Sequence, residues 1–348
     1  MSEVVNYVID GNIGVISVDY PPVNALSQAV RQGLHDAITA AQTDASEAIV
    51  IVCEGRTFIA GADITEFGKP PAEPYLPDLL DVIEASQKPV IAAIHGTALG
   101  GGFETTLAAH YRCAVASAKI GLPEVKLGLL PGAGGTQRTP RLGGVQAALD
   151  LMTSGNPISA SAALELGLID KLVDGDLGRA AIAWARELVE QGASPRKTSE
   201  QAVPAFDAAI FDGYRATLAK RARGQLAPQK IVDCVEAAAR RSFEEGLTVE
   251  RKLFFECMES PQSAALRHLF FAERQAAKID GLPKVTPQRS IDSVGIIGGG
   301  TMGGGIAMSF ANAGIPVTLI EIIDDALARG LYIVEKNYAA SVKRGKLS

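Results

Sequence analysis

Three consecutive glycines at residues 100–102, followed by Phe103 and Glu104, constrain the fold of this chain more than any other feature. The apolar run 89–94 before them predicts a buried strand, and residues 105–110 after them predict the first turns of a buried helix. Because glycine has no Cβ, the backbone at this junction can approach a ligand closely, and the N–H groups of the helix's first turn point towards it. The junction therefore predicts a site for a negatively charged oxygen, supported by the helix dipole.

Glu104 lies two residues after the last glycine, so a carboxylate is held beside this predicted anion site. An enzyme that forms an enolate needs both features, donors for the oxygen and an acid or base for the proton. The alternative is a glycine-rich turn with a solvated glutamate. Residues 58–63 resemble the same device, because the apolar strand predicted at 48–53 leads to a turn of small residues that contains Ala62. Two such turns can supply two backbone donors to one oxygen.

A second glutamate, Glu124, is predicted on a turn between apolar segments. A charge without a partner is costly there, so this side chain is either exposed or functional. Elsewhere in this half, residues 4–9 and 13–19 predict a hairpin, and Ser27 predicts the N-cap of a helix to about residue 42. The four prolines within 68–78 predict a surface loop, followed by a helix at 79–86.

Composition limits the classes of function. A length of 348 residues predicts two or three domains. The hydrophobic content of 47% is enough for a sizeable core. The net charge of -6 argues against nucleic acid or an anionic membrane surface as the main partner. The cysteines are far apart, form no CxxC pair and have no histidine at metal-ligand spacing, which predicts inert core thiols, a reduced compartment and no metal site; they are Cys53, Cys113, Cys234 and Cys257. Without a signal peptide or a membrane-spanning apolar run, we expect a soluble cytoplasmic protein.

The order of these features resembles the crotonase family, specifically its enoyl-CoA hydratases. The resemblance covers residues 10–190 and is carried by the segments 58–63, 88–96, 98–104, 123–124, 127–138 and 162–169. It implies an α/β fold with a crotonase-like spiral core of ββα units. It also implies that the N–H groups of Ala62 and Gly101 form an oxyanion hole for the thioester oxygen of an acyl-CoA substrate. Glu104 and Glu124 would then flank the C2–C3 bond of that substrate.

The expected reaction is syn addition of water to 2-trans-enoyl-CoA, giving 3-hydroxyacyl-CoA in fatty-acid β-oxidation. We assign Glu104 to deprotonating the water and Glu124 to delivering a proton to C2, without any cofactor. Two carboxylates favour hydration, because family members that isomerise 3-enoyl thioesters manage with one, and isomerisation stays open as a side activity. The alternatives are another crotonase reaction, such as isomerisation or thioester hydrolysis, and a non-catalytic acyl-CoA-binding module. The assembly expected is a monomer or a crotonase-type trimer.

Beyond residue 190 the composition changes. Residues 194–200 are polar, and residues 202–277 are helical in pattern almost throughout. The segments 242–256 and 269–278 resemble the helical linker of multifunctional β-oxidation enzymes, whose helices pack on the hydratase domain. The alternative is a generic helical oligomerisation tail.

A dinucleotide fingerprint follows near the end. A strand predicted at 293–297 leads to Gly298, Gly300 and Gly303 in a GxGxxG pattern, and Glu321 ends the next strand, 18 positions on (321 minus 303). This part resembles the start of a 3-hydroxyacyl-CoA dehydrogenase domain. The resemblance implies that the three glycines face the pyrophosphate of NAD and that Glu321 binds its ribose hydroxyls.

Only two strands of this nucleotide fold are predicted, and the dehydrogenase family needs a catalytic histidine within that domain. The histidines His35, His95, His110 and His268 all precede the fingerprint. We therefore expect an N-terminal piece of a longer enzyme, with poor NAD affinity and no dehydrogenase activity. The domains predicted are a hydratase domain at 1–192, a helical linker packing on it at 193–287, and an incomplete Rossmann NAD-binding domain at 288–348.

Overall fold

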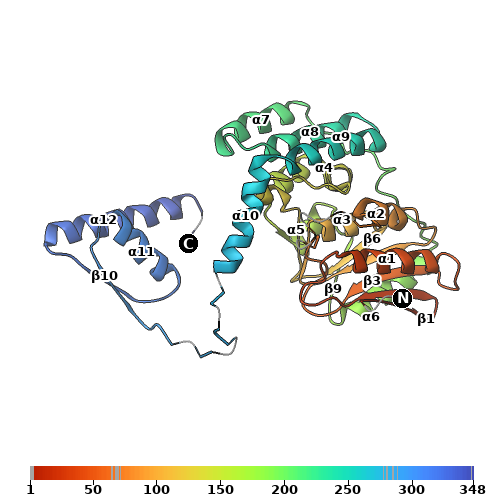
Figure 1. The fold of residues 1–348 in the computed structure, drawn as a ribbon, viewed down its shortest axis with the longest axis horizontal. Coiled ribbons are helices and arrows are strands. Elements are labelled where there is room, and N and C mark those ends of the chain that lie inside the picture. Colours follow the sequence, from red (N-terminus) through yellow and green to blue (C-terminus); the bar gives the residue numbers. More distant parts are fainter. Residues whose placement is uncertain are drawn as a thin grey trace. The chain divides into compact units, whose positions relative to one another are not determined.

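A six-stranded sheet runs through the N-terminal part of the chain in the computed structural model (Figure 1). The structure describes residues 4–63, 66, 70, 72–276, 278, 279, 281–283, 286, 287, 289–345, 347 and 348. The strands, in their order across the sheet, are β1 (Val5–Asp10), β2 (Ile13–Val18), β3 (Ala48–Cys53), β4 (Val90–Ile94), β6 (Tyr111–Val115) and β9 (Lys171–Val173). The predicted hairpin is confirmed, since β1 pairs antiparallel with β2. All other neighbours in this sheet are parallel.

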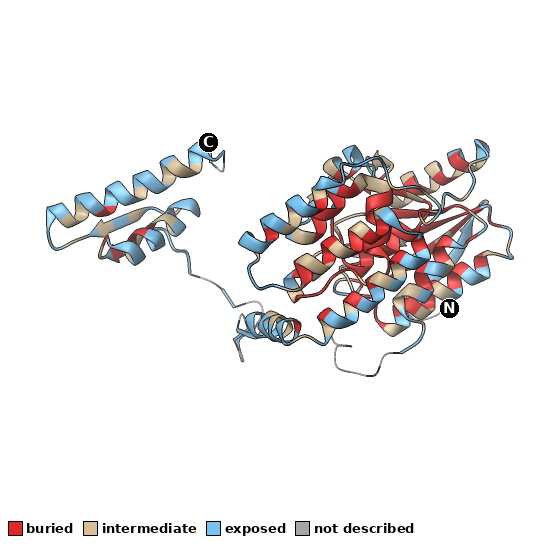
Figure 2. Cartoon of the chain, turned by 90° about the horizontal axis from the view of Figure 1, so that it is seen from above, coloured by how far each residue is buried: buried red, intermediate tan, exposed pale blue. Residues whose placement is uncertain are grey.

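Helices cover both faces of this sheet. Helix α6 (Leu177–Glu190) packs Ala181 and Ala185 against one face. The larger core lies on the opposite face, under α1 (Gln28–Ala41), α2 (Leu76–Glu84) and α3 (Gly101–Ala108). Figure 2 shows the buried residues concentrated between these layers. Strands covered on both faces are expected to be continuously apolar, as β3 is.

The helix boundaries follow local capping. Ser27 caps α1 as predicted, because its side chain accepts a hydrogen bond from the N–H of Val30. Helix α2 begins at Leu76, so the predicted loop at 68–78 is wrong for its last three residues. The N–H of Tyr75 donates to Asp78 Oδ2 at 3.0 Å, and proline is tolerated in the first turn of a helix. Residues 68, 69 and 71 of that loop lie outside the described residues.

A second, three-stranded sheet places the two predicted glutamates at one edge. Its order is β5 (Thr97–Leu99), β7 (Lys119–Gly121) and β8 (Ile158–Ser159). Strands β5 and β7 are parallel, with Leu99 opposite Gly121. Helix α3 follows β5, and the short 3₁₀ helix η2 (Glu124–Leu127) follows β7. Because parallel strands end at the same edge, the chain carries Glu104 and Glu124 to the same place.

A helical layer completes the first unit, Met1–Ala277. It consists of α4 (Gly135–Ser154), α5 (Ala160–Glu165), α7 (Ala209–Arg221), α8 (Ala227–Arg240), α9 (Phe243–Met258) and α10 (Pro261–Ala276). Helix α8 packs along α4, and α9 contacts both of them. Residues 202–207 form no helix, which limits the predicted helical region to the residues after them.

The second unit, Lys278–Ser348, contains the predicted strand pair. Strands β10 (Val294–Ile297) and β11 (Val317–Ile320) are parallel. Helix α11 (Thr301–Asn312) connects them, and α12 (Asp324–Lys343) packs on α11. None of the helices in the described part of the chain has both the length and the apolar character needed to cross a membrane.

Tight backbone packing at the start of α3 predicts a stability effect. A Cβ on Gly102 would lie 2.1 Å from the carbonyl oxygen of Ile59. We therefore expect Gly102→Ala to lower the free energy of unfolding by about 1–3 kcal/mol. Urea unfolding followed by the fluorescence of Trp184, the only tryptophan of the chain, measures this. The matched control is Gly213→Ala in α7, where a Cβ meets nothing within 4 Å and should stabilise by about 0.5–1 kcal/mol. Equal stability of the two variants would contradict the prediction.

Candidate active site

Two glycine-containing turns from distant parts of the sequence lie side by side. The N–H of Leu99 donates to the carbonyl oxygen of Ile59 at 3.1 Å. A Cβ on Gly101 would lie only 3.8 Å from the backbone nitrogen of Ala62. The structure therefore brings together the two residues predicted to donate to one oxygen. Gly61 and Gly100 precede them with φ of +122° and +54°, a conformation that favours glycine.

The N–H of Gly101 belongs to the first turn of α3, which has no acceptor within its own helix. Apolar side chains close around this turn, because a Cβ on Gly101 would lie 2.7 Å from Leu76 and 3.1 Å from Leu26. The second turn is held by Leu26, whose N–H donates to the carbonyl oxygen of Gly61 at 2.9 Å. A donor in such apolar surroundings interacts more strongly with a developing negative charge than it does in water.

Glu104 is fixed by two backbone hydrogen bonds. Its side chain is buried, with 3% of the residue exposed, and Oε1 accepts from the N–H groups of Ala133 and Gly135, both at 2.8 Å. Burial raises the pKa of this carboxyl, while the two N–H donors and the charge of Arg138 oppose that rise. Gly135 is required for this contact, because a Cβ there would lie 2.7 Å from Oε1 of Glu104. The alternative of a solvated glutamate is therefore excluded.

Glu124 sits beside the same turns with one oxygen unpaired. Its Oε2 is buried and has no hydrogen-bond partner among the described residues. A Cβ on Gly100 would lie 3.0 Å from the other carboxyl oxygen, Oε1. Burial raises the pKa of Glu124 well above its ordinary value, and the nearby charge of Glu104 raises it further.

The two carboxyls therefore differ in their hydrogen-bond donors and in how readily they keep a proton. Glu104 receives two N–H donors, which favour its ionised form. Oε2 of Glu124 has no donor among the residues that the structure describes, so Glu124 keeps its proton more readily. Because they interact electrostatically, their titrations belong to the pair. Environments that push two pKa values apart provide one acid and one base at the same pH.

A third buried carboxyl, Glu250, was not among the predicted site residues. It comes from α9, is 1% exposed, and accepts from the N–H groups of Gly134 at 2.7 Å and Thr136 at 3.0 Å. Burial, followed by the charge of Glu104, raises the pKa of Glu250 to about 8. A glutamate in the apolar stripe of an amphipathic helix was the available signal, since Leu253 and other α9 residues at helical spacing are buried.

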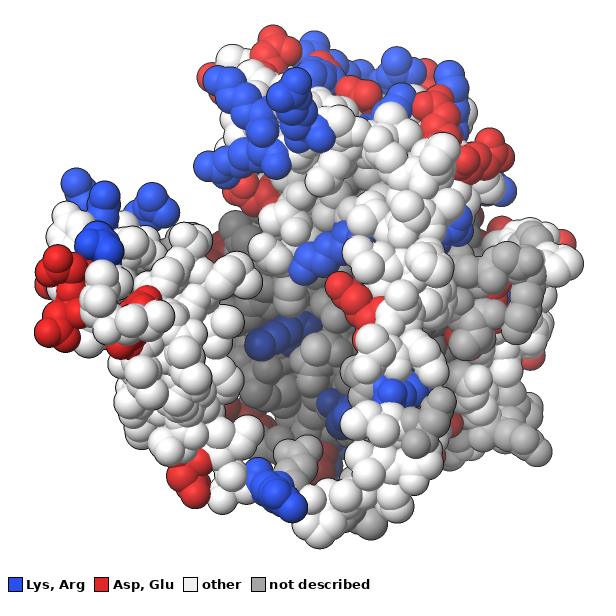
Figure 3. All heavy atoms as spheres, turned by 60° about the vertical axis from the view of Figure 1, so that its left-hand side comes forward, with Lys and Arg blue, Asp and Glu red and all other residues white. Residues whose placement is uncertain are grey.

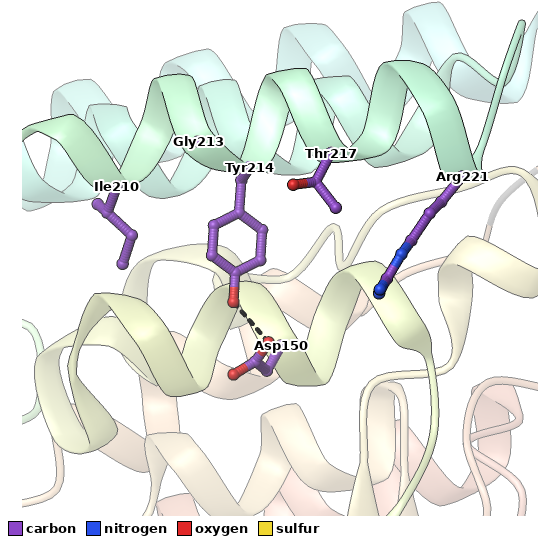
Figure 4. A pocket seen from close by; sticks show the side chains of 6 residues that line it. All are labelled: Asp150, Ile210, Gly213, Tyr214, Thr217 and Arg221. Carbon is purple, nitrogen blue, oxygen red and sulfur yellow. Dashed lines mark hydrogen bonds between the residues drawn. The ribbon is translucent and has the colours of Figure 1, made fainter. Parts of the chain in front are cut away.

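A separate cavity of about 410 Å³ lies between α4 and α7, with none of the predicted site residues in its lining. Figure 4 shows the hydroxyl of Tyr214 pointing to Asp150, to which it donates at 2.5 Å. Tyr214 also accepts from the side-chain amide of Gln146. These polar groups are paired with one another, which indicates a role in joining the two helices.

In Figure 3, Lys and Arg side chains gather on the helical layer, with acidic side chains interspersed.

The four cysteines, which the sequence predicts to be core thiols, are all buried and form no disulfide. Burial raises the pKa of the Cys53 thiol well above its ordinary value and that of Cys113 to about 12. A thiol that stays protonated is a poor nucleophile and metal ligand. Within the described ranges, no group of three or more His, Cys, Asp or Glu side chains could hold a metal ion.

The predicted nucleotide-binding residues also come together in the second unit. Gly298 has φ of +97° and Gly300 is the N-cap of α11. A Cβ on Gly303 would lie 1.7 Å from the carbonyl oxygen of Gly298, so only glycine allows this packing. Glu321 Oε1 accepts from the N–H of Gly299 at 2.6 Å. A Cβ on Gly300 would meet nothing within 4 Å, so the turn is open where the pyrophosphate of NAD would approach, and the residues fit this group.

The buried carboxyl of Glu124 predicts a pH-dependent stability. A carboxyl with a raised pKa binds its proton more tightly in the folded state, so its favourable contribution is complete below its ordinary pKa. That contribution is lost as pH rises towards the raised pKa. We expect Glu124→Gln to gain stability relative to the wild type as pH rises above 4.5, the ordinary pKa of this carboxyl, measured as thermal midpoints at increasing pH. The exposed control Glu165→Gln should show no such trend, and a difference independent of pH for Glu124→Gln would contradict the explanation.

Comparison with known proteins agrees with this geometry. Residues 9–222 match the enoyl-CoA hydratase/isomerase family, and residues 293–348 match the NAD binding domain of 3-hydroxyacyl-CoA dehydrogenase. The solved structure of carnitinyl-CoA hydratase from Mycobacterium avium is 30% identical and covers 81% of this chain and all (100%) of its own, with a TM-score of 0.57. The predicted crotonase fold is thereby confirmed.

Two curated relatives match nearly the whole chain. The chain is 41% identical over 345 residues to the peroxisomal bifunctional enzyme of Danio rerio, covering 97% of this chain and 48% of the relative. It is 35% identical over 352 residues to the glyoxysomal fatty acid beta-oxidation multifunctional protein MFP-a of Cucumis sativus, covering 97% and 49%. The chain thus spans about half the length of these curated relatives.

These names correct one prediction. The expected cytoplasmic location is wrong, because the relatives are named peroxisomal and glyoxysomal enzymes. Compartment addresses of this kind are short signals read by receptors, so composition did not reveal them. The predicted family is confirmed by the match that extends over more than half of the chain. This chain belongs to the enoyl-CoA hydratase/isomerase family, and its last residues match the NAD binding domain of 3-hydroxyacyl-CoA dehydrogenase.

Proposed function

We propose that this chain catalyses syn hydration of 2-trans-enoyl-CoA to 3-hydroxyacyl-CoA. The observation that carries the proposal is a pair of electrostatically interacting carboxyls beside the turns of Ala62 and Gly101, namely the buried Glu104 and Glu124 with its buried Oε2. Glu104 is held by two N–H donors, and the buried Oε2 of Glu124 has no hydrogen-bond partner within the described part of the chain. The relatives' names, which refer to bifunctional enzymes and fatty acid β-oxidation, agree with this reaction.

The N–H groups of Ala62 and Gly101 bind the thioester carbonyl oxygen in this proposal. Attack of water at C3 moves electrons through the C2–C3 double bond onto that oxygen. Donors already in position stabilise the enolate more than the ground state, because the negative charge develops only during the reaction. Loss of one such donor typically costs about 3 kcal/mol of transition-state stabilisation.

The two carboxyls move the protons. Glu104, as the carboxylate, removes a proton from the water as its oxygen bonds to C3. Glu124, as the acid, delivers its proton to C2, so that the elements of one water molecule are added. Transfer of a proton from Glu104 to Glu124 then restores the starting state. This assignment rests on the N–H donors that favour ionised Glu104 and on the strongly raised pKa of Glu124.

The domain assignment is part of the proposal. We infer a hydratase domain at 1–192, a linker at 193–287 whose helices pack on it, and the start of an NAD-binding domain at 288–348. The contacts of α8 and α9 with α4 support the packing. From its match to the NAD binding domain of 3-hydroxyacyl-CoA dehydrogenase, we infer that the last part would serve oxidation of the hydration product with NAD.

Turnover of a short-chain 2-enoyl-CoA tests the reaction. We expect the wild type to consume the enoyl absorbance, and Glu104→Gln and Glu124→Gln each to slow it by about 100- to 10,000-fold. Mass spectrometry of the acyl-CoA products should identify the 3-hydroxyacyl thioester. Loss in only one variant, with 3-enoyl substrate still converted, would instead indicate isomerase chemistry.

A non-catalytic acyl-CoA-binding module is the contrasting outcome. Such a protein would show no turnover, and Glu104→Gln would leave its affinity for acyl-CoA unchanged. The exposed control Glu165→Gln should behave as the wild type does in both assays.

We expect this 348-residue chain to bind NAD weakly. The described part of the second unit contains the two strands β10 and β11, and a pair of strands does not hold a pyrophosphate turn rigidly. Titration calorimetry with NAD measures the affinity, with Gly300→Val as a control that blocks the open turn. Tight binding to the wild type that Gly300→Val abolishes would contradict the expectation.

A further inference from the structure

Four successive N–H groups at the start of α4 are divided between two buried carboxylates. Glu104 accepts from Ala133 and Gly135, while Glu250 accepts from Gly134 and Thr136. The Thr136 hydroxyl also bonds to Glu250. Residues 133–136 therefore lie between a carboxylate from α3 and one from α9. A change in either carboxylate alters the position of donors that serve the other.

Helix α9 is fastened to this segment by further contacts. The guanidinium carbon of Arg138 lies 5.0 Å from the ring centre of Phe243, and Arg138 Nη1 donates to the carbonyl oxygen of Ala133 at 3.0 Å. A Cβ on Gly246 would lie 2.0 Å from the side-chain oxygen of Gln137, so α9 approaches α4 closely. These contacts leave Glu250 little freedom to move, because close-packed interiors transmit displacements.

We propose that Glu250 is a positioning residue of the hydratase site, which holds residues 133–136 so that their N–H groups orient Glu104. The inference rests on the proposed function, and it makes α9 a required part of that site. In this role Glu250 takes no proton from substrate. Its effect passes through the backbone to Glu104 and through its charge to Glu124.

The electrostatic part of this effect has a definite sign. The titratable and charged groups around Glu250 come from several elements: Glu104 on α3, Glu124 on η2, Arg138 on α4 and Cys234 on α8. Arg138 is in turn paired with Glu84 on α2 at 2.7 Å. Above its own pKa of about 8, ionised Glu250 adds to the rise in the pKa of Glu124 that burial and the charge of Glu104 produce. Glu124 then keeps its proton to higher pH, which extends activity on the alkaline side. Removing the charge shifts the alkaline limb of the rate profile to lower pH.

Glu250→Gln in the full chain tests the proposal. The amide keeps the size of the side chain and one acceptor oxygen, but it presents an N–H₂ group to a donor of the 133–136 segment. We expect kcat for short-chain 2-enoyl-CoA to fall by about 100-fold with little change in KM, because a misplaced base affects the transition state more than substrate binding. The alkaline limb should also move to lower pH, which a purely structural role would not produce.

Two further variants complete the experiment. Glu259→Gln makes the same change at an exposed position at the end of α9 and should retain the wild-type kcat and pH profile. Thr136→Val keeps the backbone N–H but removes the hydroxyl partner of Glu250, and we expect a smaller fall in kcat in the same direction. It provides the test if Glu250→Gln fails to fold by circular dichroism. Wild-type kcat and pH profile in the folded variants would overturn the inference.

The amide signals of Ala133 and Gly135 in ¹⁵N-labelled full chain separate this inference from the proposed function. If the wild type hydrates enoyl-CoA and Glu250→Gln does so equally well, with unmoved signals, the positioning role is wrong and the reaction stands. If the wild type shows no hydration but the signals shift in Glu250→Gln, the reaction is wrong and the positioning of the segment stands. Neither hydration nor shifted signals would overturn both.

Discussion

The burial of carboxyl groups beside backbone N–H donors is the constraint on which this structure depends. Glu104 and Glu250 are both nearly inaccessible to solvent, and an unpaired buried charge is costly. Four N–H groups at the start of α4 compensate for this, two for each side chain. N–H groups at the start of a helix have no acceptor within the helix. The carboxyl groups provide that acceptor, and the N–H groups provide donors to the buried carboxyls. Among the described residues Oε2 of Glu124 has no such partner, and burial raises the pKa of this carboxyl well above its ordinary value.

The arrangement of the strands explains why these groups meet. Strands β5 and β7 are parallel neighbours, so α3 and η2 begin at the same edge of their sheet. The turns at Ala62 and Gly101 are brought together by the hydrogen bond between Leu99 and Ile59. Glycine is needed where the backbones come closest, as at Gly102 against the carbonyl oxygen of Ile59. The site thus depends on contacts between segments that are far apart along the chain, and its precision comes from strands and helices more than from flexible loops.

The structure shows what the helices after residue 208 contact, which the sequence pattern alone did not indicate. Their resemblance to a known helical linker implied packing on the preceding domain, and in the structure α8 and α9 contact α4. What pattern alone did not indicate is that α9 carries a glutamate into the carboxylate cluster. Amphipathic periodicity identifies the buried face of a helix but does not identify its partner. A polar residue on that face is the only local sign, and Glu250 is such a residue.

The sequence by itself therefore predicted local structure and motifs. These are the hairpin, the Ser27 cap, strand β3, the glycine junctions and the dinucleotide fingerprint. Each of these depends on neighbouring residues, whose backbone preferences and periodicity are written in order. The early start of α2 at Leu76 was missed, because proline is also common in loops. Only the tertiary structure decided that Oε2 of Glu124 is buried with no partner among the described residues. It also decided that residues 133–136 are shared by two carboxyl groups and that Glu250 is one of them. Burial and pKa depend on every atom that displaces water around a group, and those atoms come from distant segments that no local pattern brings together.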